Sequence, residues 1–124
     1  MKIKLTSVYV DDQEKALRFY TEVLGLTVVA HLGDQTLLQC GPQNLALFQV
    51  KRPPLTPEQR QERITRPLGK GHHAFTVSRA DFAAAPERLA QAGVEIAPTI
   101  VWGDHDCRYF LDPDGNLLEL VSYR

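Results

Sequence analysis

Residues 11–26 read DDQEKALRFYTEVLGL, and this stretch decides how the rest of the chain is interpreted. Leu17, Tyr20 and Leu24 recur at spacings of three and four residues, which places them on one face of a helix. The two aspartates at its start offer an N-cap, and Gly25 suits the left-handed conformation with which helices often end. The stretch therefore predicts an amphipathic helix that ends at Gly25.

Strand patterns lie on both sides of this helix. Residues 1–10 alternate β-branched and aromatic side chains with others, which is typical of a strand. Three further strand candidates follow, separated by Gly-containing turns, at residues 26–31, 35–40 and 44–50. The first fifty residues thus predict a strand, a helix and three strands, in the order βαβββ.

The same order returns in the second half of the chain. A strand at 72–77 precedes an alanine-rich helix, which Ser78 can cap and Gly93 can end. Three more strand candidates follow, at residues 94–101, 106–111 and 117–122. Pro86 lies inside the predicted helix, so that helix either bends there or begins near Pro86. Such internal repetition predicts an α+β fold made of two βαβββ modules.

A proline-rich connector joins the two modules. Residues 51–71 contain six basic residues against Glu58 and Glu62, so the connector carries a net charge of +4. Thr56 and Pro57 resemble the start of a short helix that reaches about Ile64. The connector is either a solvated link or a basic lip beside an anionic ligand. We expect one domain over 1–124, with module one at about 1–50 and module two at about 72–124.

Composition excludes several classes of protein. The 124 residues are 44% hydrophobic and 23% charged, with a net charge of −1. This balance is globular and lacks the basic excess of a nucleic-acid binder. No apolar run approaches the length of a membrane span, and the two cysteines do not form a disulfide framework. We expect a cytoplasmic protein that binds neither nucleic acid nor a membrane.

Two motifs resemble a known family. The helix DDQEKALRFYTEVLGL and the closing segment FLDPDGNLLEL, residues 110–120, are similar to the signatures of the vicinal oxygen chelate superfamily. That group contains glyoxalases, bleomycin-resistance and fosfomycin-resistance proteins, and extradiol dioxygenases. The resemblance implies that the two βαβββ modules form a cupped eight-stranded mixed sheet, paired in a homodimer.

The resemblance also implies a metal site. In metal enzymes of the group, side chains from the first and fourth strands of the modules hold a divalent ion, which chelates adjacent oxygens of the substrate. His72 and Glu119 fall on two of these positions, as metal ligands and catalytic residues. The corresponding positions in module one hold Leu5 and Leu47. The implied cofactor is Mn, Fe, Ni or Zn, in a site that lacks its first-strand ligand.

The predicted inward position of Glu119 requires an explanation in terms of its partners. An inward carboxylate among leucines is costly to bury without a partner, so we expect a pair with His72 or Arg108, or a role as a ligand or general base. If Glu119 points into the cup, alternation along the strands predicts which other side chains line it. These are Leu5, Ser7, Tyr9, Leu45, Leu47, Ala74 and Thr76, with either Cys107 and Tyr109 or Arg108 and Phe110.

Five residues are candidates for substrate binding: Tyr9, Trp102, His105, Arg108 and Tyr109. Trp102 can pack in the core or stack on a ligand. His105 can be a solvated loop histidine or contact a ligand.

Two function classes remain open. One is a metal-assisted lyase, isomerase, transferase or ring-cleaving dioxygenase that acts on a small oxygen-rich molecule. The other is a metal-free dimer that binds a small molecule, as in the bleomycin-resistance branch. The paired His72 and Glu119 favour the first class. The leucines at Leu5 and Leu47 favour the second.

Overall fold

The computed structural model describes residues 1–124 and divides into two compact units, Met1–Pro54 and Leu55–Arg124. Each unit is built around one four-stranded mixed sheet. The predicted α+β class and the two βαβββ modules are confirmed. None of the helices is long and apolar enough to cross a membrane.

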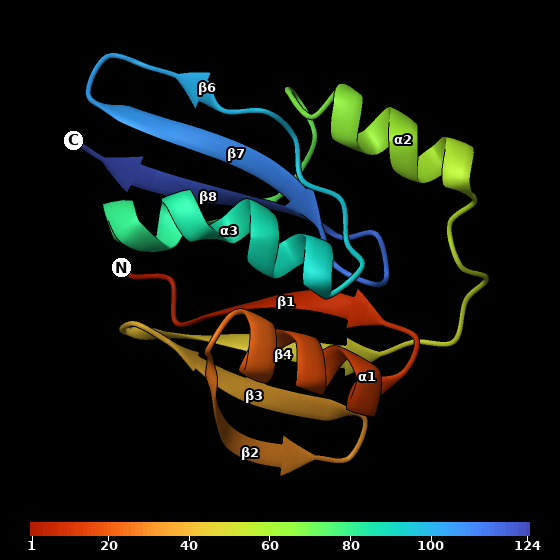
Figure 1. Ribbon diagram of the computed structural model, residues 1–124. Helices are drawn as coiled ribbons and strands as arrows, with labels where there is room; N and C mark the ends of the chain where they lie inside the picture. Colours follow the sequence, from red (N-terminus) through yellow and green to blue (C-terminus); the bar gives the residue numbers. More distant parts are fainter. The chain divides into compact units, whose positions relative to one another are not determined.

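The first unit consists of a mixed sheet and a helical segment, whose elements are labelled in Figure 1. The strands lie in the order β1-β4-β3-β2, and β1 runs parallel to β4. Their bounds are β1 (Leu5–Val10), β2 (Thr27–Leu32), β3 (Gln35–Cys40) and β4 (Gln43–Gln49). The helix α1 (Gln13–Arg18) continues as a π-helical turn, η1 (Phe19–Val23). The Asp12 carboxylate caps α1 by accepting from the backbone N–H groups of Glu14 and Lys15.

The core of the first unit lies between α1 and one face of this sheet, the α1 face. Leu38, Leu45 and Leu47 on the strands are buried, as are Phe19 and Tyr20 on the helical segment. This arrangement corrects the predicted cup lining. Val8 pairs with Leu47 in the parallel ladder, so Leu45 and Leu47 project to the opposite side from Leu5, Ser7 and Tyr9.

The second unit contains the other sheet and two helices. The strands lie in the order β5-β8-β7-β6, with β5 parallel to β8. The elements are α2 (Pro57–Thr65), β5 (His73–Thr76), α3 (Arg79–Gln91), β6 (Ile100–Val101), β7 (His105–Leu111) and β8 (Leu117–Tyr123). The predicted connector helix is α2, which begins at a capping box made by Thr56 and Gln59. Pro86 lies within α3, which starts at Arg79.

The predicted strand over 94–101 is much shorter in the structure. Only Ile100 and Val101 pair with β7, and Ile96 forms one isolated bridge to Phe110. Pro98 lies between these two points of pairing and has no N–H to donate to a ladder. Residues 94–99 therefore form an irregular segment before β6.

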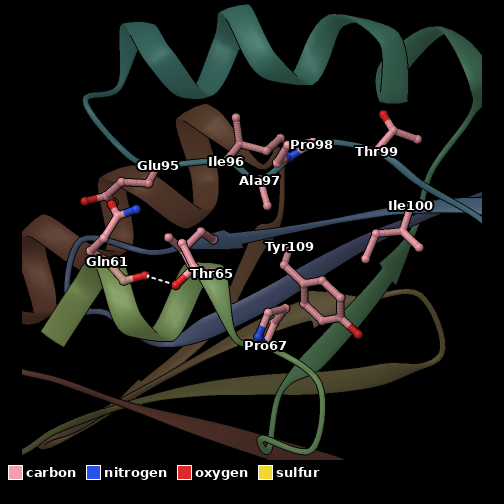
Figure 2. Close-up of a pocket in the computed structure, with 11 residues that line it drawn as sticks. Gln61, Thr65, Pro67, Glu95, Ile96, Ala97, Pro98, Thr99, Ile100 and Tyr109 are labelled. Atoms are coloured by element: carbon pink, nitrogen blue, oxygen red, sulfur yellow. Dashed lines mark hydrogen bonds between the residues drawn. The ribbon is translucent and has the colours of Figure 1, made fainter. Parts of the chain in front are cut away.

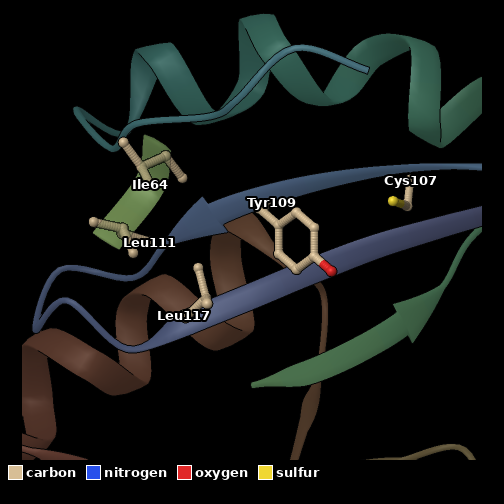
Figure 3. Packing of buried hydrophobic residues seen from close by; sticks show 5 residues of the cluster. All are labelled: Ile64, Cys107, Tyr109, Leu111 and Leu117. Carbon is tan, nitrogen blue, oxygen red and sulfur yellow. The ribbon is translucent and has the colours of Figure 1, made fainter. Parts of the chain in front are cut away.

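Two helices contact opposite faces of the second sheet. Arg79, at the start of α3, binds Asp106 at 2.9 Å and the Ser122 carbonyl at 3.0 Å, so α3 lies on the face of β7 and β8 to which Asp106 projects. On the other face, α2 buries Ile64 against strand residues, as Figure 3 shows. Those residues are Cys107, Tyr109, Leu111 and Leu117. We call these surfaces the α3 face and the Tyr109 face.

Candidate functional site

A histidine and a glutamate meet on the Tyr109 face. Glu119 lies on β8 directly beside Ala74 of β5, and His72 immediately precedes β5. His72 Nε2 is 2.9 Å from Glu119 Oε2. The Glu119 side chain is only 12% exposed and that of His72 is 27% exposed. The chain therefore supplies the buried carboxylate with a partner at the point where the two parallel strands meet.

Hydrogen bonding defines the state of this pair. His72 Nδ1 is 2.8 Å from the Lys70 carbonyl oxygen, which can only accept, so Nδ1 carries a proton and donates. The Nε2–Oε2 contact then holds one further proton between imidazole and carboxylate. The pair is either an imidazolium with a carboxylate or an imidazole with a carboxylic acid. In both forms Nε2 faces Glu119, because the Lys70 carbonyl fixes the ring.

Tyr109 and Cys107 complete the surroundings of the pair. Tyr109 is the cross-strand neighbour of Glu119, and its ring meets the His72 imidazole edge to face at 5.2 Å. Burial and the nearby Glu119 and Cys107 raise the pKa of the Tyr109 phenol. Burial also raises the pKa of the Cys107 thiol. Glu119 raises this pKa further, whereas the hydrogen bond from the Trp102 indole N–H lowers it. Both groups therefore stay protonated near neutral pH, and Cys107 is not an activated nucleophile.

The structure brings some of the other predicted residues to this face and not others. Cys107 and Tyr109 lie on it, whereas Arg108 and Phe110 project to the α3 face. The Arg108 Nε donates to the Ala97 carbonyl at 3.0 Å, so Arg108 is not the partner of Glu119. His73 pairs with Leu118 and also lies on the α3 side, where burial, and secondarily His72, lower its pKa.

Trp102 and His105 form a group further along the same sheet. Their rings stack at 6.3 Å, and His105 also lies 5.2 Å from the ring of Tyr123. Trp102 is 46% exposed and donates its indole N–H to the Cys107 sulfur at 3.2 Å. His105 Nδ1 is 2.7 Å from Asp104. Cys107 thus links this aromatic group to Glu119.

Tyr9 belongs to the first unit, where it is 54% exposed and packs edge to face on Phe48. On the same face, the ladder pairs Ser7 with Ala46, just as it pairs Ala74 with Glu119 in the second unit. The module-one counterpart of Glu119 is therefore Ala46, not Leu47. Leu5 lies on this face as well, 42% exposed.

The pair offers part of a metal site. An imidazole nitrogen fixed by a carbonyl on its other side, facing a carboxylate, is a common donor arrangement for a divalent ion. The chain contains no group of three or more His, Cys, Asp or Glu side chains arranged to hold a metal. The residues present thus fit a divalent ion with two protein ligands. They do not fit a site with three.

A hollow that the sequence did not predict lies beside the pair. It has a volume of about 520 Å³ and is bounded by α2, the irregular segment before β6 and Tyr109 (Figure 2). Its lining consists of Gln61, Ile64, Thr65, Pro67, Glu95, Ile96, Ala97, Pro98, Thr99, Ile100 and Tyr109. Pro98, which interrupts strand pairing here, was the available signal in the sequence.

Arg60 attaches α2 to the rest of the second unit. Its guanidinium binds both carboxylate oxygens of Glu95, at 2.8 and 2.6 Å, and the carbonyls of Asp112 and Pro113, at 3.0 and 3.1 Å. The Arg60 side chain is 18% exposed. One basic residue of the connector is thus a structural clamp that holds one wall of the hollow.

Acid should weaken this clamp. The Arg60 hydrogen bonds, opposed by burial, lower the pKa of Glu95 below its ordinary value of 4.5. A lowered carboxyl pKa stabilises the folded state above the ordinary value, and this stabilisation is lost as the pH falls through the lowered one. We expect the wild type to have a larger free energy of unfolding than Glu95→Gln. The difference should be constant above about pH 5.5 and should decrease as the pH is lowered towards about 3. Urea titrations across this range measure it, and a difference independent of pH would contradict the ion pair.

Comparison with known proteins agrees with this architecture. The family model of the Glyoxalase/Bleomycin resistance protein/Dioxygenase superfamily matches residues 2–120. The chain is 36% identical over 115 residues to glutathione transferase FosA of Serratia marcescens, covering 90% of this chain and 73% of FosA.

Two solved structures are similar over nearly all of both chains. Lactoylglutathione lyase of Agrobacterium tumefaciens is 27% identical with a TM-score of 0.70, over 98% of this chain and 92% of the lyase. The fosfomycin resistance protein FosX of Listeria monocytogenes, complexed with Mn(II) and sulfate, is 18% identical with a TM-score of 0.74, over 100% of this chain and 90% of FosX. The chain therefore belongs to the glyoxalase/bleomycin resistance protein/dioxygenase superfamily, the vicinal oxygen chelate group that its two motifs resemble.

Proposed function

We propose that the Tyr109 face of the second sheet binds a small oxygen-rich molecule at His72 and Glu119, with a divalent metal ion held by these two side chains. The observation that carries the proposal is the 2.9 Å contact between Nε2 and Oε2, with Nδ1 engaged by a backbone carbonyl. Mn(II) is the first ion to test, because it accepts mixed nitrogen and oxygen ligands and is the ion in the FosX structure.

Each residue around the pair has a definable part in this function. The Lys70 carbonyl keeps Nε2 directed at Glu119. The ring of Tyr109 packs against the imidazole and restricts its position. A bound divalent ion would supply Lewis-acid polarisation of adjacent ligand oxygens. Without the ion, Glu119 and His72 could instead exchange a proton with those oxygens.

A histidine substitution with a matched neighbour tests the proposal. His72→Ala should weaken Mn(II) binding by about tenfold or more, since removal of an outer-shell partner alone costs 10–100-fold. His73→Ala is the control, because His73 projects to the α3 face. Isothermal titration calorimetry and the electron paramagnetic resonance signal of free Mn(II) measure the affinity. Equal affinities in the two variants would overturn the assignment of the metal to this pair.

A metal-free binding protein is the second candidate function. It is favoured by the absence of a third metal-binding side chain at the pair. Here a ligand oxygen would compete with Glu119 for the hydrogen bond at His72 Nε2. Acetohydroxamic acid, which carries two adjacent oxygens, and the epoxide antibiotic fosfomycin are suitable probes. Binding that survives in EDTA and is lost in His72→Ala would favour the metal-free function, whereas binding that requires Mn(II) would favour the first.

A further inference from the structure

The hollow has a mainly apolar lining, whereas the pair of His72 and Glu119 is polar. Ile64, Ile96, Ala97 and Ile100 supply much of its surface. Glu95 is its only carboxylate, and Arg60 neutralises that charge through two hydrogen bonds. The volume of about 520 Å³ lies within the range of small-molecule sites. A charged group placed here would lose water without gaining a free counter-charge.

Tyr109 joins the hollow to the pair. Its ring lines the hollow, stands against the His72 imidazole at 5.2 Å and lies across the ladder from Glu119. The chain makes the same connection a second time, because Pro67 lines the hollow and its carbonyl accepts from Lys70 N–H at 3.1 Å, two residues before His72. Tyr109, which is 5% exposed, is thus a side chain that contacts the His72 imidazole and also lines the hollow.

Ala97 and Thr65 of the wall form hydrogen bonds within the protein. Ala97 N–H donates to the Tyr109 carbonyl at 2.8 Å, and the Ala97 carbonyl accepts from Arg108 at 3.0 Å. The Thr65 hydroxyl donates to the Gln61 carbonyl at 2.8 Å, as the dashed line in Figure 2 shows. With these groups satisfied, binding in the hollow comes from burial of apolar surface.

We infer that the hollow is a subsite for an uncharged apolar group of the ligand whose oxygens engage His72 and Glu119, an inference that rests on the proposed function. The substrate class is then an oxygen-bearing molecule with an uncharged alkyl or aryl tail. A cavity of about 150 Å³ already accommodates benzene, so this hollow has room for an aryl group. A compact, wholly polar ligand would leave it empty.

Hydroxamic acids with different tails test this inference. All carry the same pair of adjacent oxygens, and the tails are methyl, butyl, 2-phenylethyl and 4-aminobutyl. We expect affinity for the wild type to rise by about tenfold or more from the methyl to the phenylethyl compound, because the aryl group buries apolar surface. The cationic aminobutyl tail should give no gain over methyl. Calorimetry with and without Mn(II) measures each affinity.

Variants that fill the hollow locate the gain. In Ala97→Phe and in Gln61→Phe, the ratio of phenylethyl to methyl affinity should fall to about one, because an added ring occupies the space of the tail. Two variants on different walls guard against a folding defect in either. Gln91→Phe, at the end of α3 and outside the lining, is the matched control and should keep the wild-type ratio.

The outcomes separate this inference from the function beneath it. If the methyl compound binds and Glu119→Gln abolishes its binding, but longer tails bring no gain, the subsite is wrong and the proposed function stands. A gain that persists in both filling variants also overturns the subsite. If no hydroxamate binds with or without Mn(II), the proposed function and the subsite both fail.

Discussion

Glu119→Gln is expected to weaken Mn(II) binding by about 100-fold or more. Outer-shell partners alone contribute 10–100-fold to metal affinity, and Glu119 would supply the only anionic oxygen of a two-ligand site. The glutamine keeps the size of the side chain, and its amide can donate to His72 Nε2, so the fold should not change. The measurement is a Mn(II) titration followed by electron paramagnetic resonance and calorimetry.

Two controls make this result specific. Glu62→Gln removes a carboxylate from α2 that is bound only by Lys70 at the surface, and it should leave Mn(II) affinity within about twofold of wild type. Nitrogen-15 spectra of His72 in Glu119→Gln should show a proton on Nδ1, because the Lys70 carbonyl still accepts it. Undiminished Mn(II) binding in a correctly protonated Glu119→Gln variant would place the metal elsewhere.

Arg60→Ala should reduce the free energy of unfolding by about 2–3 kcal/mol, since hydrogen bonds to charged groups contribute 1.5–3 kcal/mol and Arg60 makes four. The helix depends on this clamp because Ile64 is the only residue that α2 buries. Leu55 adds a close contact just before the helix, against Gly115, whose φ of +85° and missing Cβ leave room for it. Chemical denaturation measures the loss.

The same helix provides the control. Arg63→Ala makes the same change of residue type in the same helix, so its effect on helix propensity is similar to that of Arg60→Ala. It should change the free energy of unfolding by less than about 0.5 kcal/mol. Arg60→Lys should recover part of the loss, because an ammonium keeps the charge but cannot bind both oxygens of Glu95 as a fork. Additive effects of Arg60→Ala and Glu95→Gln in a double-mutant cycle would show that the two side chains do not act together.

Sequence periodicity predicted the secondary structure well where a strong local signal exists. The amphipathic helix before Gly25 and the capped helix after Ser78 both form, since caps and apolar stripes act within a few residues. The prediction of a strand over 94–101 was wrong because Pro98 has no N–H to donate to the ladder. The predicted pairing of His72 with Glu119 was one of several alternatives, and the antiparallel register of β7 and β8 distinguishes it from a pair with Arg108, because Arg108 projects to the other face.

The face of the sheet to which a side chain projects was harder to predict than the position of the strand in the sequence. The sequence predicted Leu47 as the module-one counterpart of Glu119, one residue away from Ala46, which occupies the corresponding rung. A shift of one residue moves every side chain to the other face of a sheet, so a small error in aligning two repeats exchanges core and site. The hollow and the Arg60 clamp involve residues far apart in sequence, which no local pattern reports.

The difference between Ala46 and Glu119 makes the two modules chemically unequal. These residues occupy the same rung of two similar modules, one ending in a methyl group and the other in a carboxylate paired with a histidine. The two modules thus share one architecture, and at this rung only the second offers a group that can carry charge or exchange a proton.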